Sequence, residues 1–138
     1  MLFWNMSKPH PILDNQINKD SYETGAIFLY TIVMVGTDIV YIPRVVLKQS
    51  FIDYVLTEDE RIMYEKIHLD KRKKEFVAGR IACKEAIFKA TQDKEYLSYS
   101  ILNTSDGKPY VKDHPEIEIS ISHDQDYALA FVIIQSIS

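Results

Sequence analysis

The sequence contains one cysteine, Cys83, so no disulfide bond can form within the chain. This favours a reduced, intracellular protein over a small secreted domain held together by disulfides. An excess of basic residues is also missing, because the formal net charge is -4. Proteins whose main function is nucleic-acid binding usually carry a basic domain. The composition therefore argues against that class, although it leaves room for a local basic pocket.

Long hydrophobic runs are missing too. The longest apolar run, AIFLYTIVMV at residues 26–35, is far shorter than the roughly 20 residues that a membrane-spanning helix needs. Polar residues precede it where a secretion signal has a basic segment, so it is a poor signal peptide. Its β-branched and aromatic residues favour a buried strand. We therefore expect a cytoplasmic protein without a membrane segment.

The chain has no internal repeat and no low-complexity segment, and its 138 residues suit one domain. Residues 1–24 differ from the rest, since they are polar, include two prolines and show no clean periodicity. We expect them to form a flexible N-terminal extension. Residues 25–138 are expected to form a single domain.

Three helices are predicted in the middle of the sequence. PRVVLKQSFIDYVL, residues 43–56, is typical of a short helix with its proline in the first turn. Thr57 is expected to cap a second helix, with Glu60 completing a capping box. Asp70 is expected to cap a third helix that runs to about residue 91. Its core side is marked by apolar or small residues three or four positions apart, namely Phe76, Gly79, Cys83, Ala86 and Ala90.

Strands dominate the last third of the sequence. YLSYSIL alternates, and DGKPYV predicts a turn that leads into a short strand. EIEISIS, residues 116–122, alternates strictly and predicts a half-buried strand. HDQD predicts a turn, and YALAFVII predicts a fully buried partner strand that completes a hairpin. The order of elements predicts an α+β fold with an antiparallel sheet packed on a long helix.

Four charged residues interrupt the long predicted helix. Glu85 and Lys89 are four residues apart and share a helix face, which is typical of an exposed ion pair. Arg80 and Lys84 have the same spacing but like charge, so they repel unless solvent screens them or an anion lies nearby. The second pair is therefore a hint of an anionic ligand, while Lys84 is equally consistent with simple solvation.

Two further polar residues stand at the ends of predicted strands. Asp38 follows a long apolar strand, where Gly36 predicts a bend or a close backbone approach. A carboxylate there is costly to bury unless it is paired or holds a metal, although a turn or helix-capping role is equally open. His123 lies at the tip of the predicted hairpin, where a surface turn residue is the simpler interpretation.

The order of four motifs is more specific than any one of them. GTDIVYIPR, FVAGRIACKEAIFKA, LNTSDGKPYV and ISISHDQDYALAFVI follow one another between residues 34 and 134. This pattern resembles the holo-acyl-carrier-protein synthase family, the small bacterial 4′-phosphopantetheinyl transferases. The resemblance implies the fold of that family and a magnesium-dependent enzyme. It would transfer the 4′-phosphopantetheine arm of coenzyme A to a serine of apo acyl carrier protein, in support of fatty acid biosynthesis.

The resemblance also implies roles for individual residues. Asp38 and Glu85 match the metal ligands, and Glu85 is the implied route for the serine proton, directly or through a water. Lys89 matches a lysine near the pyrophosphate. The implied contacts to the nucleotide half of coenzyme A involve both charged side chains and a turn: Arg80, Gly107, Lys108, Pro109, Ser122 and His123.

Partners follow from the same resemblance. Arg44 matches a basic residue that faces the acidic carrier protein, and electrostatic steering would suit that encounter. Residues 71–74, all basic, either add to this surface or form a solvated charge run. Family members are commonly homotrimers with active sites shared between subunits, so a homotrimer is expected.

The sequence departs from the family pattern in two places. Tyr41 replaces a common glutamate, and KATQDKEY replaces a glycine-rich segment after the helix. These departures keep open a degenerate, non-catalytic module that binds coenzyme A or carrier protein. A purely structural α+β domain with exposed helix ion pairs is the third interpretation. Cys83, where alanine is common, is expected to be a buried packing residue.

Overall fold

The computed structural model describes residues 31–137. The predicted extension at residues 1–24 and the beginning of the first predicted strand, residues 26–30, lie outside this range. The predicted limits of the single domain therefore stay a prediction. Within residues 31–137, no helix is both long enough and apolar enough to cross a bilayer.

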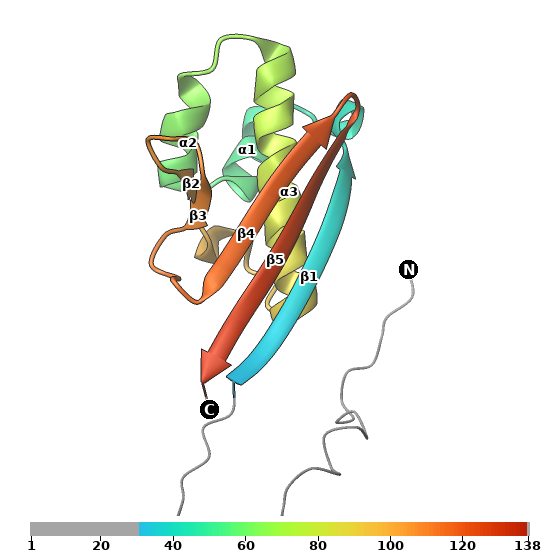
Figure 1. Cartoon of the computed structure of the whole chain (residues 1–138). Helices are drawn as coiled ribbons and strands as arrows, with labels where there is room; N and C mark the ends of the chain where they lie inside the picture. Colours follow the sequence, from blue (N-terminus) through green and yellow to red (C-terminus); the bar gives the residue numbers. More distant parts are fainter. Residues whose placement is uncertain (1–30, 138) are drawn as a thin grey trace, which may run out of the picture. The chain divides into compact units, whose positions relative to one another are not determined.

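Three antiparallel strands form the main sheet in the order β1-β5-β4 (Figure 1). They are β1 (Thr31–Tyr41), β5 (Tyr127–Ile137) and β4 (Ile117–Asp124). The predicted hairpin is confirmed as β4–β5, with Asp124 paired to Tyr127. The predicted end of the first strand at residue 35 is wrong, because β1 continues to Tyr41. Its hydrogen-bonded ladder with β5 runs the full length of both strands.

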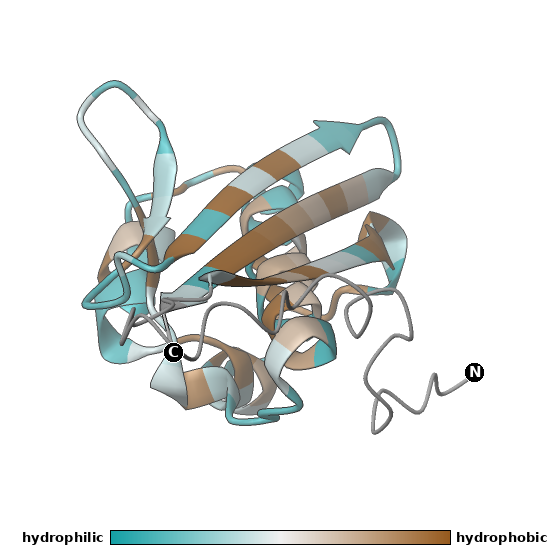
Figure 2. Cartoon of the chain, turned by 60° about the horizontal axis from the view of Figure 1, so that its bottom comes forward, coloured by the Kyte–Doolittle hydropathy of each residue, from teal (hydrophilic) through white to brown (hydrophobic). Residues whose placement is uncertain are grey.

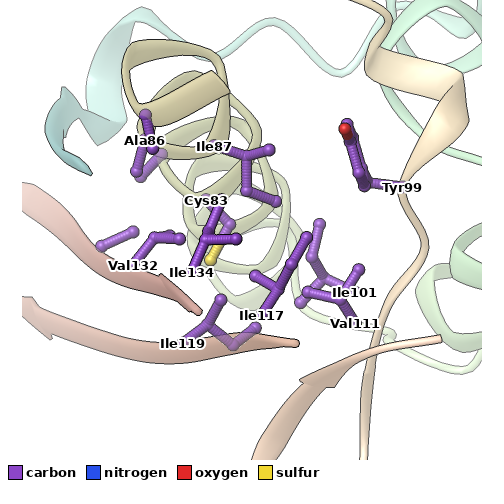
Figure 3. Close-up of a cluster of buried hydrophobic side chains, with 13 residues drawn as sticks. Cys83, Ala86, Ile87, Tyr99, Ile101, Val111, Ile117, Ile119, Val132 and Ile134 are labelled. Carbon is purple, nitrogen blue, oxygen red and sulfur yellow. The ribbon is translucent and has the colours of Figure 1, made fainter. Parts of the chain in front are cut away.

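Helix α3 (Asp70–Thr91) packs across one face of this sheet (Figure 1). Figure 3 shows side chains of α3, among them Cys83, Ala86 and Ile87, meeting Val132 and Ile134 of β5. The predicted core side of the helix is confirmed, since Gly79, Cys83, Ala86 and Ala90 are buried and Phe76 is half-buried. Burial raises the pKa of the Cys83 thiol to about 12, so it stays protonated and packs as a small apolar group.

Between β1 and α3, the predicted 14-residue helix at residues 43–56 is wrong. Pro43 enters only a short 3-10 turn, η2 (Ile42–Arg44), and α1 (Gln49–Val55) begins after an extended segment. Helix α2 (Glu58–Glu65) begins at the predicted capping box: the Thr57 N–H donates to Glu60 Oε2 at 2.8 Å, and the Glu60 N–H donates back to Thr57 Oγ1 at 3.3 Å. The predicted cap of α3 is wrong, because Leu69 is the N-cap and Asp70 lies in the first turn.

A second, two-stranded sheet lies beside α3. It pairs β2 (Ile101–Asn103) with β3 (Pro109–Val111). The predicted strand at residues 96–102 is only partly correct, because its first half forms a 3-10 turn, η3 (Tyr96–Ser98). The DGKP turn does lead into a short strand, as predicted.

The face of the main sheet opposite α3 is apolar, and no other segment of residues 31–137 covers it. Figure 2 shows hydrophobic residues along most of β5, whereas hydropathy alternates along β4. The prediction of a fully buried β5 is therefore wrong: its alanines pack against α3, while the residues between them are exposed. The exposed apolar residues of β1 and β5 on this outer face are Val33, Val35, Ile39, Tyr41, Tyr127, Leu129 and Phe131.

Candidate active site

The backbone of β1 approaches α3 most closely at Gly36. A Cβ atom added there would lie 1.9 Å from the carbonyl oxygen of Ala86 and 3.3 Å from the amide nitrogen of Ala90. Only a residue without a side chain allows this crossing. Gly36 is thus a point of close approach and not a bend, and the strand continues beyond it. Two residues later, on the same face of β1, Asp38 is directed toward the helix.

Asp38 and Lys89 meet at this crossing. The ammonium group of Lys89 lies 2.8 Å from Asp38 Oδ1 and donates to the carbonyl oxygen of Thr37 at 3.1 Å. The Asp38 side chain is 18% exposed and that of Lys89 is 46% exposed, so the pair stays open to a ligand. Asp38 lies inside β1, paired with Ala130, and the predicted position at the strand end is wrong.

Glu85 lies one helical turn before Lys89 and is half-buried. The hydroxyl group of Tyr96 donates to its Oε1 atom. Burial raises the pKa of Glu85, the Asp38 carboxylate raises it further, and Lys89 and Lys94 oppose the rise. The exposed Glu85–Lys89 ion pair suggested by the helix spacing is not formed, because Lys89 pairs with Asp38.

These two carboxylates fit the requirements of a magnesium ion. Magnesium takes oxygen ligands, typically one or two carboxylates, and completes its shell with substrate phosphates and waters. Asp38 and Glu85 come from different elements and are close enough for the charge of Asp38 to act on Glu85. Across residues 31–137, no cluster of three or more potential metal-ligating side chains occurs. Asp38 and Glu85 thus offer two metal ligands, and a substrate would have to complete the ligand shell of the ion.

Arg80 and Lys84 are both buried, which corrects the solvated interpretation of Lys84. Its ammonium group contacts Glu60 Oε2 at 2.6 Å and the carbonyl oxygen of Val55 at 2.6 Å. Burial lowers the pKa of Lys84, and the Glu60 carboxylate opposes this fall. The anion that offsets the Arg80–Lys84 repulsion is therefore Glu60 of the protein itself. The capping box predicted Glu60 as a cap, but nothing local in the sequence predicted its contact with Lys84.

Arg80 is directed toward the small sheet. Its Nη2 group donates to Asn103 Oδ1 at 2.6 Å, and Asn103 Nδ2 donates to the carbonyl oxygen of Gly107 at 2.9 Å. The structure thus brings together Arg80 and the turn of Gly107, Lys108 and Pro109, as the predicted nucleotide site requires. Asn103 was missed by the sequence reasoning, because an asparagine at the end of a short strand has no distinctive pattern.

The remaining predicted residues lie at other places on the surface. Ser122 and His123 are exposed near the end of β4. His123 lines a cavity of about 430 Å³ together with Lys71 and Arg72 of the basic first turn of α3. Arg44 lies at the end of η2, with its guanidinium carbon 5.8 Å from the centre of the Tyr41 ring.

The two departures from the family pattern also have structural counterparts. The Tyr41 ring lies 5.4 Å from that of Tyr127. It therefore lies on the outer face of the sheet, away from Asp38. After α3, Gln92 takes the left-handed conformation, φ 66°, in which helices commonly use glycine. Gln92 thus ends the helix without the missing glycine.

A family model described as the 4′-phosphopantetheinyl transferase superfamily matches residues 34–132 of this sequence. The chain belongs to this family. The resemblance drawn from the four sequence motifs is thereby confirmed, and so is the predicted fold class, a helix packed on an antiparallel sheet. The family match covers the candidate site from Asp38 to His123.

The matched part of this chain spans nearly the full length of its relatives and of a solved structure of this family. A holo-[acyl-carrier-protein] synthase of Acholeplasma laidlawii is 40% identical over 112 residues, covering 74% of this chain and 95% of the relative. One from Geobacillus sp. is 39% identical over 119 residues, covering 78% and 99%. The crystal structure of a holo-(acyl-carrier-protein) synthase from Bacillus anthracis, in complex with CoA (3′,5′-ADP), has a TM-score of 0.69. It is 34% identical and covers 78% of this chain and 99% of that one.

Proposed function

We propose that this protein transfers the 4′-phosphopantetheine arm of coenzyme A to a serine of apo acyl carrier protein. The observation that carries the proposal is the meeting of Asp38, Glu85 and Lys89 at the β1–α3 crossing in a chain of this family. The names of the relatives support the carrier protein as one substrate, and the CoA complex of the Bacillus anthracis protein supports the other. The proposal extends to a cytoplasmic, magnesium-dependent enzyme that supports fatty acid biosynthesis.

The proposed reaction is a phosphoryl-type substitution. The serine oxygen forms a bond to the β-phosphorus of coenzyme A, and the bond from that phosphorus to the bridging oxygen breaks. Adenosine 3′,5′-bisphosphate leaves with the bridging oxygen. Asp38 and Glu85 would hold a magnesium ion, which would supply positive charge to the pyrophosphate when bound. In such reactions most catalysis comes from positioning and from charges fixed in advance.

The side chains of this chain have distinct tasks in that scheme. Lys89 uses two of its three N–H donors on Asp38 and the carbonyl of Thr37, so one remains for a phosphate oxygen. Glu85 forms no ion pair with another described residue and is the proposed route for the serine proton, directly or through a water. Arg80, His123 and the Gly107 turn are proposed to hold the nucleotide half.

Replacing Glu85 by glutamine tests this assignment. The change keeps the size of the side chain but removes its charge, so we expect transfer to fall by roughly 10²–10³-fold. The measurement is mass spectrometry of apo acyl carrier protein incubated with coenzyme A and magnesium. Glu65→Gln, on the exposed end of α2, is the matched control and should retain wild-type transfer. Equal activity of Glu85→Gln would refute the role of Glu85, and no transfer by the wild type would refute the proposed function.

The carrier protein is proposed to approach the surface around Arg44. Carrier proteins are acidic, and this basic side chain is exposed at the end of η2. Complementary charge at the rim of an interface mainly increases the rate of association. The basic residues 71–74 would contribute to this surface only where they lie beside the docked carrier protein.

A homotrimer is proposed as the active assembly. The uncovered apolar face of β1 and β5 is of the kind that usually marks a protein–protein contact. Among the described residues, no hydrogen bond or ion pair joins the Asp38–Lys89 pair to Arg80 or to the Gly107 turn. An active site shared between neighbouring copies would bring the Asp38–Lys89 pair of one copy together with Arg80 and the Gly107 turn of another. This supports the same assembly.

Replacing Phe131 by glutamate tests the assembly. Phe131 is 42% exposed on the outer face of β5, and a carboxylate there would be buried without a partner in a trimer. We expect the wild type to sediment as a trimer and Phe131→Glu as a monomer that has lost transfer. Ile62→Glu, which places the same charge on an exposed position of α2, should remain trimeric. A wild-type monomer would contradict the proposed assembly, as would a trimeric Phe131→Glu variant.

A further inference from the structure

Asn103 connects helix α3 to the turn between β2 and β3. Its Oδ1 atom accepts a hydrogen bond from Arg80 Nη2 at 2.6 Å, and its Nδ2 group donates to the carbonyl oxygen of Gly107 at 2.9 Å. The orientation of the amide follows from chemistry, because a guanidinium can only donate and a carbonyl can only accept. Either an aspartate or a leucine at this position would lose at least one of the two bonds.

Arg80 is an unusual buried cation, because its hydrogen-bond partner is neutral. It is 6% exposed, and its guanidinium carbon lies 3.8 Å from the centre of the Phe76 ring. Lys84 and Lys89 each contact a carboxylate directly. Glu60 acts on Arg80 only through its field, because its own contacts go to other groups. The charge of Arg80 is therefore not cancelled by direct contact within residues 31–137.

Arg80 also has an unused donor. Its Nε–H is buried and lacks a hydrogen-bond partner in the part of the chain that the structure describes. A buried donor of this kind costs free energy unless a ligand or water satisfies it. The cation is thus held in place on one side by Asn103 and Phe76, with donor capacity left over for an anion.

The turn itself is ordered by local hydrogen bonds. The Lys108 N–H donates to Thr104 Oγ1 at 3.0 Å, and the Gly107 N–H donates to the Thr104 carbonyl oxygen at 2.9 Å. Gly107 has φ +92°, which favours glycine. Residues 103–108 are exposed, so packing alone does not fix the turn against α3. The Asn103 amide supplies that connection.

We propose that Asn103 is a positioning residue for nucleotide binding, which joins Arg80 and the Gly107 turn into one unit and leaves the charge of Arg80 available to a phosphate. This inference rests on the proposed function, which assigns both groups to the nucleotide half of coenzyme A. Asn103 itself need not touch the nucleotide. Its neutral amide matters as much as its geometry, because an acid in its place would occupy and neutralise the cation.

Two substitutions separate the geometry from the charge. Asn103→Asp keeps an acceptor for Arg80 but neutralises the cation and loses the bond to Gly107. Asn103→Leu removes both bonds and leaves the cation uncancelled. We expect KM for coenzyme A to rise about tenfold or more in both, and more in Asn103→Asp. The turnover number kcat should change little, because Asn103 does not contact Asp38, Glu85 or Lys89.

Direct binding of adenosine 3′,5′-bisphosphate, measured by calorimetry, provides a readout independent of turnover. Its Kd should rise in parallel with KM in both variants. Thr104→Val is the matched control: it loosens the same turn but leaves the Arg80–Asn103 bond, so its effect should be smaller. Thermal unfolding of the three variants shows whether each is folded. If Asn103→Leu does not fold, Asn103→Asp alone suffices for the test.

The outcomes distinguish this proposal from the proposed function. If the wild type transfers the arm and folded Asn103 variants keep its KM and Kd, the positioning role is overturned while the function stands. A fall in kcat with unchanged Kd overturns it as well. If the wild type neither transfers the arm nor binds the nucleotide, the proposed function fails, and this inference fails with it.

Discussion

Replacing Gly36 by alanine is expected to destabilise the fold by roughly 3 kcal/mol or more and to abolish transfer. The new methyl group would overlap the backbone of α3, at 1.9 Å from the Ala86 carbonyl oxygen and 2.9 Å from its carbonyl carbon. Backbone atoms in the middle of a helix cannot move aside as a flexible side chain can. The strand must therefore separate from α3, and Asp38 moves away from Glu85 and Lys89 with it.

Urea unfolding measures the stability change, and the carrier-protein assay measures transfer. Gly79→Ala is the matched control, since a Cβ there meets only the Cγ2 methyl group of the Ile121 side chain, at 3.3 Å. It also replaces glycine by alanine within a helix, which favours helix formation by about 1 kcal/mol. Gly79→Ala should therefore unfold near the wild-type urea concentration. A Gly36→Ala protein with wild-type stability would show that the crossing is not as close as described.

Replacing Lys84 by methionine is expected to lower the free energy of unfolding by about 3–5 kcal/mol, the usual range for breaking a buried ion pair. The side chains of Lys84 and Glu60 are only 1% and 0% exposed. Methionine has similar length but leaves the Glu60 carboxylate buried without its cation. Glu60 also accepts from the Ile101 N–H at 2.9 Å and from the Thr57 N–H, so the beginning of α2 and strand β2 should loosen together.

A neighbouring ion pair supplies the comparison for this second change. Arg61 contacts Asp53 at 2.9 Å, but the two side chains are 37% and 45% exposed. Arg61→Met should therefore cost about 1 kcal/mol or less. Adding Glu60→Gln to Lys84→Met should restore part of the lost stability, because the buried negative charge is then gone. If Lys84→Met and Arg61→Met proved equally mild in urea unfolding, the buried pair would not be the link between α2, α3 and β2.

The features predicted correctly from the sequence are those whose partners lie close together in the chain. The capping box joins Thr57 to Glu60, and the β4–β5 hairpin joins strands separated by a two-residue turn. Their patterns are complete within a few residues. The long helix could be predicted equally well, because its small and apolar residues repeat over its whole length.

Some errors, such as the helix predicted at residues 43–56 and the cap predicted at Asp70, are local, but others arise where a distant segment decides the environment. The sequence alone leaves open whether Gly36 makes a bend or a close approach, and Lys84 looks solvated until Glu60 reaches it from 24 residues away. The face of β5 was misjudged for another reason: both faces carry apolar residues, so periodicity does not reveal which one packs on α3. Asn103 carries no local signal at all.

For the candidate site, the roles that the family resemblance gives to Asp38, Glu85, Lys89 and Arg80 stay predictions. Spacing along the helix alone favoured an exposed Glu85–Lys89 pair, and that interpretation was wrong. Lys89 pairs with Asp38 from 51 residues away. Only the fold brings β1 to the end of the helix where this lysine lies.

The ladder between β1 and β5 also has a consequence for how the site is made. Thr31 pairs with Ile137 and Asp38 with Ala130, so nearly the whole described chain lies between the partners. During synthesis Asp38 is among the first of these residues to leave the ribosome, yet its strand gains its pairing only after the last strand has been made. Closing so long a loop carries an entropy cost before any contact repays it. The strand that carries the Asp38 carboxylate can therefore complete its hydrogen bonds only after the end of the chain has been made.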